Sequence, residues 1–136
     1  MKIQTFFEKA GNGSCLSLCY IRAALGEKAT TTMMFDALWQ AAENNILDVD
    51  DNCYVRDAAQ LMRLVNPCKR YSVEKQKISS IEELKGELAA VNFQNGDFNH
   101  WVLVYRGQIV FDSLDDSKCV KYGKPTSARI IRMEDK

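Results

Sequence analysis

The chain has 136 residues, 46% of them hydrophobic and 26% charged, and its 18 basic and 18 acidic side chains leave no net charge. This length and composition predict a single globular domain over residues 1–136 and exclude disordered and fibrous classes. The balanced charge argues against a nucleic-acid partner and against a membrane partner. No apolar run approaches the ~20 residues that cross a bilayer and no export signal is recognisable, so we expect a cytoplasmic protein.

The first half of the chain predicts helices. Apolar residues recur at helical spacing over 14–25, 32–44 and 55–65, with capping residues at the ends. Residues 2–9 are short and mixed, which indicates an edge strand or an arm. The glycines in Gly11–Gly13 then favour a flexible loop that leads into the first helix.

The second half changes to the period of β-strands. A capping box at Ser80-Ile81-Glu82-Glu83 starts one short helix. The expected strands lie around residues 71–73, 89–93, 101–105, 109–111 and 127–133. Strands 101–105 and 109–111 are apolar on both faces, which predicts central, covered positions. Helices followed by an antiparallel sheet make an α+β fold.

Two turns are compatible with the hairpin that follows His100. A two-residue loop, Arg106-Gly107, would direct Asp112 to the face opposite His100. A three-residue loop that also includes Tyr105 would set Asp112 directly across from His100, where Cβ atoms are about 4.5–5.5 Å apart. We expect the three-residue loop, because Gly107 suits the left-handed position that it requires. His100 and Asp112 would then form a base and the group that orients it.

The five cysteines are expected to be reduced thiols, because an odd number without an export signal disfavours disulfides. They are Cys15, Cys19, Cys53, Cys68 and Cys119. Only Cys15 lies in the first turn of a predicted helix, where the helix dipole favours a thiolate. Cys19 lies one turn deeper and is the alternative nucleophile, although a core position suits it better.

These motifs resemble the papain-like cysteine peptidase superfamily, and most closely its small bacteriocin-leader-peptidase-like members, which are bacterial. The resemblance rests on the glycine-rich stretch before Cys15, on the strand pair from His100 to Ser113, and on the order Cys, His, Asp. It implies a papain-like fold with N-terminal helices, the nucleophile on the first of them, packed on a C-terminal antiparallel sheet. It also implies a thiol hydrolase without a cofactor, acting on a peptide or protein substrate. Cys15 would attack an acyl carbon, His100 would move the proton, and Asp112 would orient His100.

Members of that superfamily carry a glutamine about six residues before the nucleophile, as a donor to the oxyanion. This chain has Lys9 at that position. Asn12 and Gln4 are the candidate replacements, and the backbone N–H of Cys15 could be a further donor.

Three alternatives remain open from the sequence alone. The chain could be a catalytically weak or inactive relative that binds a peptide or partner protein, because a fold does not determine a function. It could hold zinc through some of its cysteines and His100, although Cys15 and Cys19 lack the usual short spacing of a zinc knuckle. It could also be a purely structural domain. The substrate and the oligomeric state are not predicted.

Overall fold

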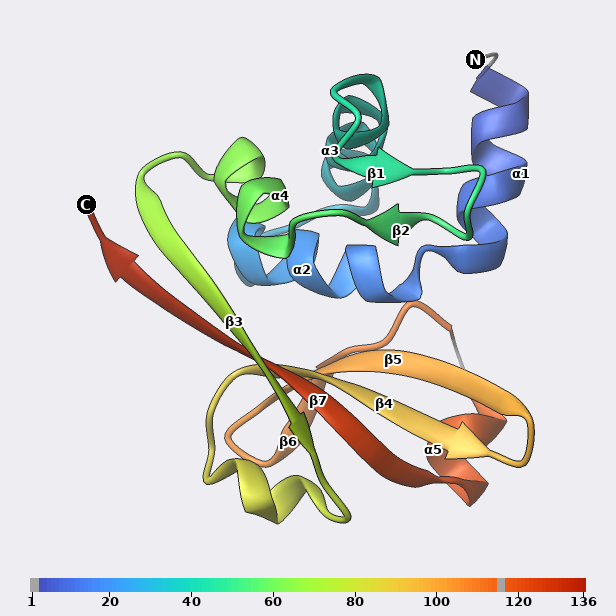
Figure 1. Cartoon of the computed structure of the whole chain (residues 1–136), viewed down its shortest axis with the longest axis vertical. Coiled ribbons are helices and arrows are strands. Elements are labelled where there is room, and N and C mark those ends of the chain that lie inside the picture. Colours follow the sequence, from blue (N-terminus) through green and yellow to red (C-terminus); the bar gives the residue numbers. More distant parts are fainter. Residues whose placement is uncertain (1–2, 115–116) are drawn as a thin grey trace. The chain divides into compact units, whose positions relative to one another are not determined.

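A computed structural model describes residues 3–114 and 117–136 (Figure 1). The chain divides into two compact units. Residues 1–71 and 134–136 form one, which we call the helical unit, and residues 72–133 form the other, which we call the sheet unit. The chain crosses between the units within two long strands, β3 (Lys69–Lys77) and β7 (Lys124–Asp135).

The helical unit contains four helices and a small two-stranded antiparallel sheet. Its elements are α1 (Ile3–Gly13), α2 (Cys15–Leu25), α3 (Thr31–Glu43), β1 (Leu47–Asp48), β2 (Tyr54–Val55) and α4 (Ala58–Val65). In the part of the chain that the structure describes, no helix has both the length and the apolar character needed to span a membrane.

The boundaries of α2, α3 and α4 follow from local signals. Thr30 Oγ1 accepts a hydrogen bond from the Met33 N–H at 3.1 Å, and Asp57 Oδ1 accepts one from the Gln60 N–H at 3.0 Å. Each bond satisfies a backbone donor that the first turn leaves without a helical partner. Gly26 ends α2 with φ +85°. The three predicted helices are thus confirmed, with the third beginning at Ala58.

The N-terminal segment differs from its prediction. Residues 2–9 were expected as a strand or arm and Gly11–Gly13 as a loop, whereas Ile3–Gly13 is one helix, α1. Phe6 and Ala10, one helical turn apart, are almost fully buried, and the Phe6 ring meets the Trp39 ring edge-on at 4.9 Å. This packing outweighs the poor helix propensity of glycine. Cys15 therefore begins the second helix of the chain, and the prediction that it lies on the first was wrong.

The core of the helical unit forms where α2 packs against α3 and α4. Ile21, Leu38, Leu61 and Met62 have no measurable exposure. Burial of side chains of this size stabilises a fold by roughly 1.5–3 kcal/mol each. This packing holds α2 in place, and the first turn of α2 is therefore held with it.

The sheet unit is built on a five-stranded antiparallel sheet in the order β3-β7-β4-β5-β6. Its further elements are the 3₁₀ helix η1 (Ile81–Leu84), β4 (Ala89–Asn95), β5 (Phe98–Tyr105), β6 (Gln108–Phe111) and α5 (Lys118–Tyr122). Helices in the first half and an antiparallel sheet in the second confirm the α+β class.

One face of this sheet carries the core of the sheet unit. Val91 lies opposite Val102 and Ala89 lies opposite Val104, so their side chains share that face. Cys119 of α5 joins the same cluster of buried residues. The sheet core is thus centred on β4 and β5, as their apolar sequences predict.

Strand β6 does not occupy the predicted central position. It lies beside β5 at one edge of the sheet, with β3 at the other edge. Ile109 and Val110, which point to opposite faces along an ordinary strand, are 41% and 42% exposed. An apolar run without alternation does not distinguish a covered strand from an apolar edge, and the order of the strands decides between them.

Candidate functional site

His100 and Asp112 are in direct contact within the sheet unit. The distance between His100 Nε2 and Asp112 Oδ1 is 2.6 Å, and the backbone N–H of Leu114 donates to the same oxygen at 2.9 Å. His100 is 3% exposed, and the side chain of Asp112 is 24% exposed. The predicted contact between the only histidine and this carboxylate is confirmed.

The turn that leads to this contact differs from the predicted one. Tyr105 pairs with Gln108, so the loop is the two-residue Arg106-Gly107 rather than a three-residue loop. Both loop residues have positive φ, +52° for Arg106 and +76° for Gly107, as the hairpin turn that matches strand twist requires. The Arg106 N–H donates to the Gly86 carbonyl at 3.2 Å, which holds a non-glycine residue in this conformation.

A β-bulge then restores the facing of Asp112. Val104 pairs with Ile109 and Leu103 with Phe111, so Val110 is one extra residue on β6. Each extra residue reverses which side chains share a face. The two-residue loop alone would turn Asp112 away from His100, and the bulge turns it back, diagonally across from the histidine. The sequence prediction thus reached the correct contact through the wrong turn.

The chemistry of the pair follows from its geometry. Phe93 lies opposite His100, and His100 continues the row of Val102 and Val104 along β5. A carboxylate can only accept hydrogen bonds, so Nε2 carries a proton and Nδ1 is the basic nitrogen of the neutral ring. A histidine oriented in this way can take up and return a proton at Nδ1.

Cys15 is the first residue of α2 in the helical unit. Ser14 stands at the expected N-cap position but its side chain makes no capping bond. Cys15 is half-buried, whereas Cys19 is 0% exposed. Only Cys15 of these two can meet a molecule from solution, and the amides of a first helical turn favour negative charge there. The structure therefore favours Cys15 over Cys19 as the nucleophile.

A loop between β1 and β2 packs against the chain just before Cys15. A Cβ atom on Gly13 would lie 2.8 Å from the carbonyl oxygen of Asn52. Cys53 Sγ is 3.9 Å from the carbonyl oxygen of Lys9, and Cys53 is 3% exposed. Burial raises the pKa of the Cys53 thiol, and the nearby negative charges of Cys15 and Asp48 raise it further. Nothing in the sequence indicated that the loop carrying Cys53 would pack against the residues before Cys15.

The expected oxyanion donors are distributed along α1. Gln4 is exposed in the first turn of this helix, about 14 Å along the axis from Gly13, which argues against a role beside Cys15. Asn12 lies in the last turn, and its side chain is outside the described part of the chain. Lys9, at the position of the glutamine, forms an ion pair with Asp50.

The predicted site residues thus fall into two groups. Cys15 belongs to the helical unit, together with Gln4 and Asn12, and the His100–Asp112 pair belongs to the sheet unit. The structure brings the base and its orienter together. The pairing of Cys15 with His100 remains a prediction.

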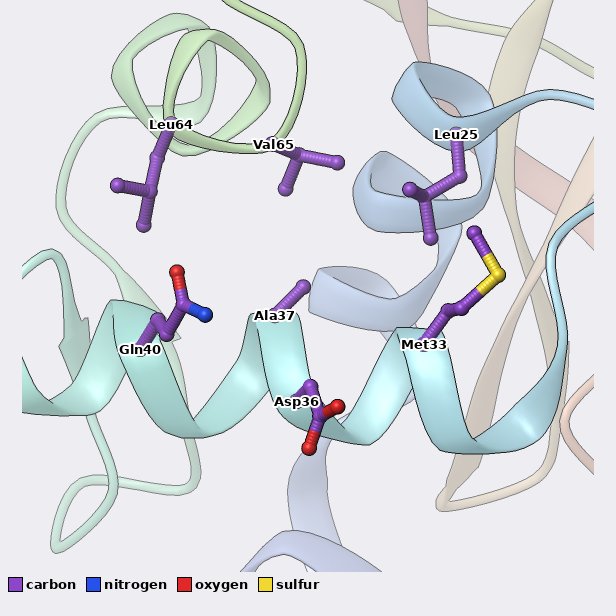
Figure 2. Close-up of a pocket in the computed structure, with 7 residues that line it drawn as sticks. All are labelled: Leu25, Met33, Asp36, Ala37, Gln40, Leu64 and Val65. Carbon is purple, nitrogen blue, oxygen red and sulfur yellow. The ribbon is translucent and has the colours of Figure 1, made fainter.

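The helical unit also has a cavity of about 240 Å³ between α3 and α4, reaching the end of α2 (Figure 2). Its lining residues are Leu25, Met33, Asp36, Ala37, Gln40, Leu64 and Val65. Cys15 is at the opposite end of α2 from Leu25, about 15 Å away along the helix axis. A ligand in this cavity would not contact the candidate nucleophile.

Metal binding finds no support in the described residues, which form no cluster of three or more His, Cys, Asp or Glu side chains suited to an ion. The zinc alternative needed such a cluster.

Comparison with known proteins identifies a family whose function is unknown. No curated protein matches the chain, and no solved structure matches it either. One family model, described as a protein of unknown function and named DUF261, matches residues 6–133. The match spans both units, and the chain belongs to the DUF261 family.

Proposed function

We propose that this protein is a papain-type thiol hydrolase that cleaves a peptide-like bond, with Cys15 as nucleophile, His100 as base and Asp112 as the residue that orients His100. The observation that carries the proposal is the 2.6 Å contact between His100 and Asp112. A buried histidine held by a carboxylate is the second half of a nucleophile–base–orienter arrangement. Cys15 at a helix N-terminus is a suitable first half.

In the proposed reaction, His100 Nδ1 takes the proton of the Cys15 thiol. The thiolate attacks the substrate carbonyl carbon, and the backbone N–H of Cys15 donates to the developing oxyanion. His100 returns the proton to the leaving amine, which leaves an acyl thioester on Cys15. Water then attacks the thioester, His100 accepts its proton, and the carboxylic acid and free thiol are released. The mechanism requires the Cys15 thiol within hydrogen-bond reach of the His100 ring, about 3–4 Å.

The test compares two thiols of the same molecule. The full chain is alkylated with iodoacetamide at pH 7, and peptide mapping gives separate rates for Cys15 and for the exposed Cys68. We expect Cys15 to react at least about tenfold faster, because each unit by which the pKa falls toward neutral raises the thiolate fraction about tenfold. His100→Asn should bring the Cys15 rate down toward that of Cys68.

Phe98→Ser is the matched control, because it alters a 73% exposed side chain on the same strand as His100. It should leave the rate ratio unchanged. Asp112→Asn should lower the Cys15 rate and shift its pH profile, since the ring would lose its orienting carboxylate. A Cys15 rate equal to that of Cys68, and unchanged by His100→Asn, would overturn the proposal.

A second candidate is a peptide-binding module without catalysis, and the cavity between α3 and α4 favours it. The cavity has apolar walls from Leu25, Leu64 and Val65, with Asp36 and Gln40 at one side (Figure 2). Such a lining suits an apolar side chain next to a basic group. Binding of apolar peptides with and without a lysine, measured on the wild type and on Asp36→Asn, tests this candidate. Binding that requires both the lysine and Asp36 supports it, and the lack of any binding refutes it.

A further inference from the structure

The loop that carries Cys53 packs against the residues that precede Cys15. Three contacts join the loop between β1 and β2 to the last two turns of α1. Lys9 forms an ion pair with Asp50, the Lys9 carbonyl lies 3.9 Å from Cys53 Sγ, and Gly13 packs directly on the Asn52 backbone. Cys53 is the next residue after Asn52, and Cys15 follows Gly13 after one intervening residue.

The two thiols differ in exposure. Cys15 is half-buried and starts a helix, while Cys53 is 3% exposed. The pKa of Cys53 is raised by burial first and by the negative charge of Cys15 second. At neutral pH a small oxidant therefore meets Cys15 first, and Cys53 is the protonated neighbour behind it.

We propose that Cys15 and Cys53 form a dithiol site that a hydroperoxide converts reversibly to a disulfide. This inference goes beyond the hydrolase proposal and does not depend on it, because it needs neither His100 nor Asp112. The substrate class is a small hydroperoxide, including hydrogen peroxide, and the modified atoms are the two sulfurs.

The reaction balances in two steps. The Cys15 thiolate attacks the O–O bond of the hydroperoxide, which yields the sulfenic acid of Cys15 and one molecule of alcohol or water. Cys53 then attacks the sulfenic sulfur and releases one water, so that the two thiols together lose two electrons and the peroxide is reduced. Once Cys15 is a neutral sulfenic acid, the charge that helped to keep Cys53 protonated is gone. The order of the two steps therefore follows from exposure, because the half-buried Cys15 meets the oxidant before the buried Cys53 does.

The loop that carries Cys53 has the conformation of a strained segment. Asn52 and Cys53 have φ of +49° and +56°, in the left-handed region that non-glycine residues rarely adopt. A disulfide requires Cα atoms about 4.4–6.8 Å apart, and a strained loop can relax as that bond forms. Reduction by a thiol would restore both cysteines.

The experiment uses the full reduced chain with about one equivalent of hydrogen peroxide. Thiols are then blocked with an alkylating agent under denaturing conditions, and the intact mass and the peptides are measured. We expect two fewer alkylated thiols, a loss of about 2 Da before alkylation, and a linked peptide pair that contains Cys15 and Cys53. Dithiothreitol should restore all five thiols.

Two variants make the result specific. Cys53→Ser should prevent the disulfide and allow the sulfenic acid of Cys15 to be trapped by dimedone. Cys119→Ser, which removes a buried cysteine of the sheet unit, is the matched control and should leave the disulfide intact. A Cys15–Cys19 linkage, or an unchanged thiol count, would overturn the assignment.

Discussion

The two halves of the candidate site are assembled in different ways. In the sheet unit, His100 and Asp112 are only 12 residues apart and meet through one hairpin. In the helical unit, the residues just before Cys15 pack against a loop that lies beyond the whole of α3 in the sequence. The hairpin is constrained by the two-residue period of strands, which leaves few possible registers. The loop is positioned by tertiary packing, with no period in the sequence to indicate its partner.

Where tertiary packing brings two backbone segments together, a glycine at the contact should be indispensable. Replacement of Gly123 should cause the largest loss of stability. A Cβ atom there would overlap the backbone carbonyl oxygens of Cys119 and Gln94, and backbone cannot move aside as a side chain can. We expect Gly123→Ala to destabilise the protein by about 3 kcal/mol or more, measured by urea unfolding. Gly96→Ala is the control. It has φ +61° and no atom within 4 Å, so it should cost only about 1 kcal/mol. Equal losses would show that the turn after α5 is not packed as described.

The helical unit offers a matched pair within one helix. Gly11 and Gly13 both lie in α1, but an added Cβ has open space at Gly11 and meets the Asn52 carbonyl at 2.8 Å at Gly13. Gly11→Ala should stabilise the protein by about 0.5–1 kcal/mol, because alanine is the better helix former. Gly13→Ala should destabilise it by about 1–3 kcal/mol, because the loop must move.

The same pair tests the contact on which the dithiol site depends. After Gly13→Ala, peroxide should form the Cys15–Cys53 disulfide more slowly than in the wild type, whereas Gly11→Ala should leave the rate unchanged. Stabilisation by both variants would mean that the loop is not held against α1.

The same contrast between local signals and tertiary packing explains which helices the sequence could predict. Three helices were identified because apolar residues recur at helical spacing, after Ser14 and Thr30 for the first two and before Asn66-Pro67 for the third. Helix α1 was missed because glycines usually interrupt helices, and the burial of Phe6 that compensates for them is a tertiary effect.

In the candidate site, too, local patterns could be predicted and tertiary contacts could not. The contact of His100 with Asp112 could be predicted because only two registers were open. The bulge at Val110 could not be predicted. A two-residue loop with a bulge and a three-residue loop both bring His100 and Asp112 to one face of the sheet. The position of Cys53 had no local signal at all, and the assignment of β6 as an edge needed the order of all five strands.

The smallest effect concerns a feature of the sheet unit that is entirely local, the capping box of η1. Glu83 accepts hydrogen bonds from the N–H groups of Ser79 and Ser80 at 2.6 and 2.8 Å, and these two bonds hold its pKa below the usual 4.5. A carboxyl with a lowered pKa in the folded state stabilises the fold above its unfolded pKa, and this contribution disappears as the pH falls through the folded value. Glu83→Gln should therefore lower the free energy of unfolding at pH 7 and have less effect near pH 3. The capping box joins neighbours in sequence. The informative contrast is therefore Glu74→Gln, which removes an exposed carboxylate on β3 that accepts a bond from Arg132 across the sheet. A larger acid-dependent loss from Glu74→Gln would mean that long-range pairing, rather than local capping, controls the pH dependence of this unit.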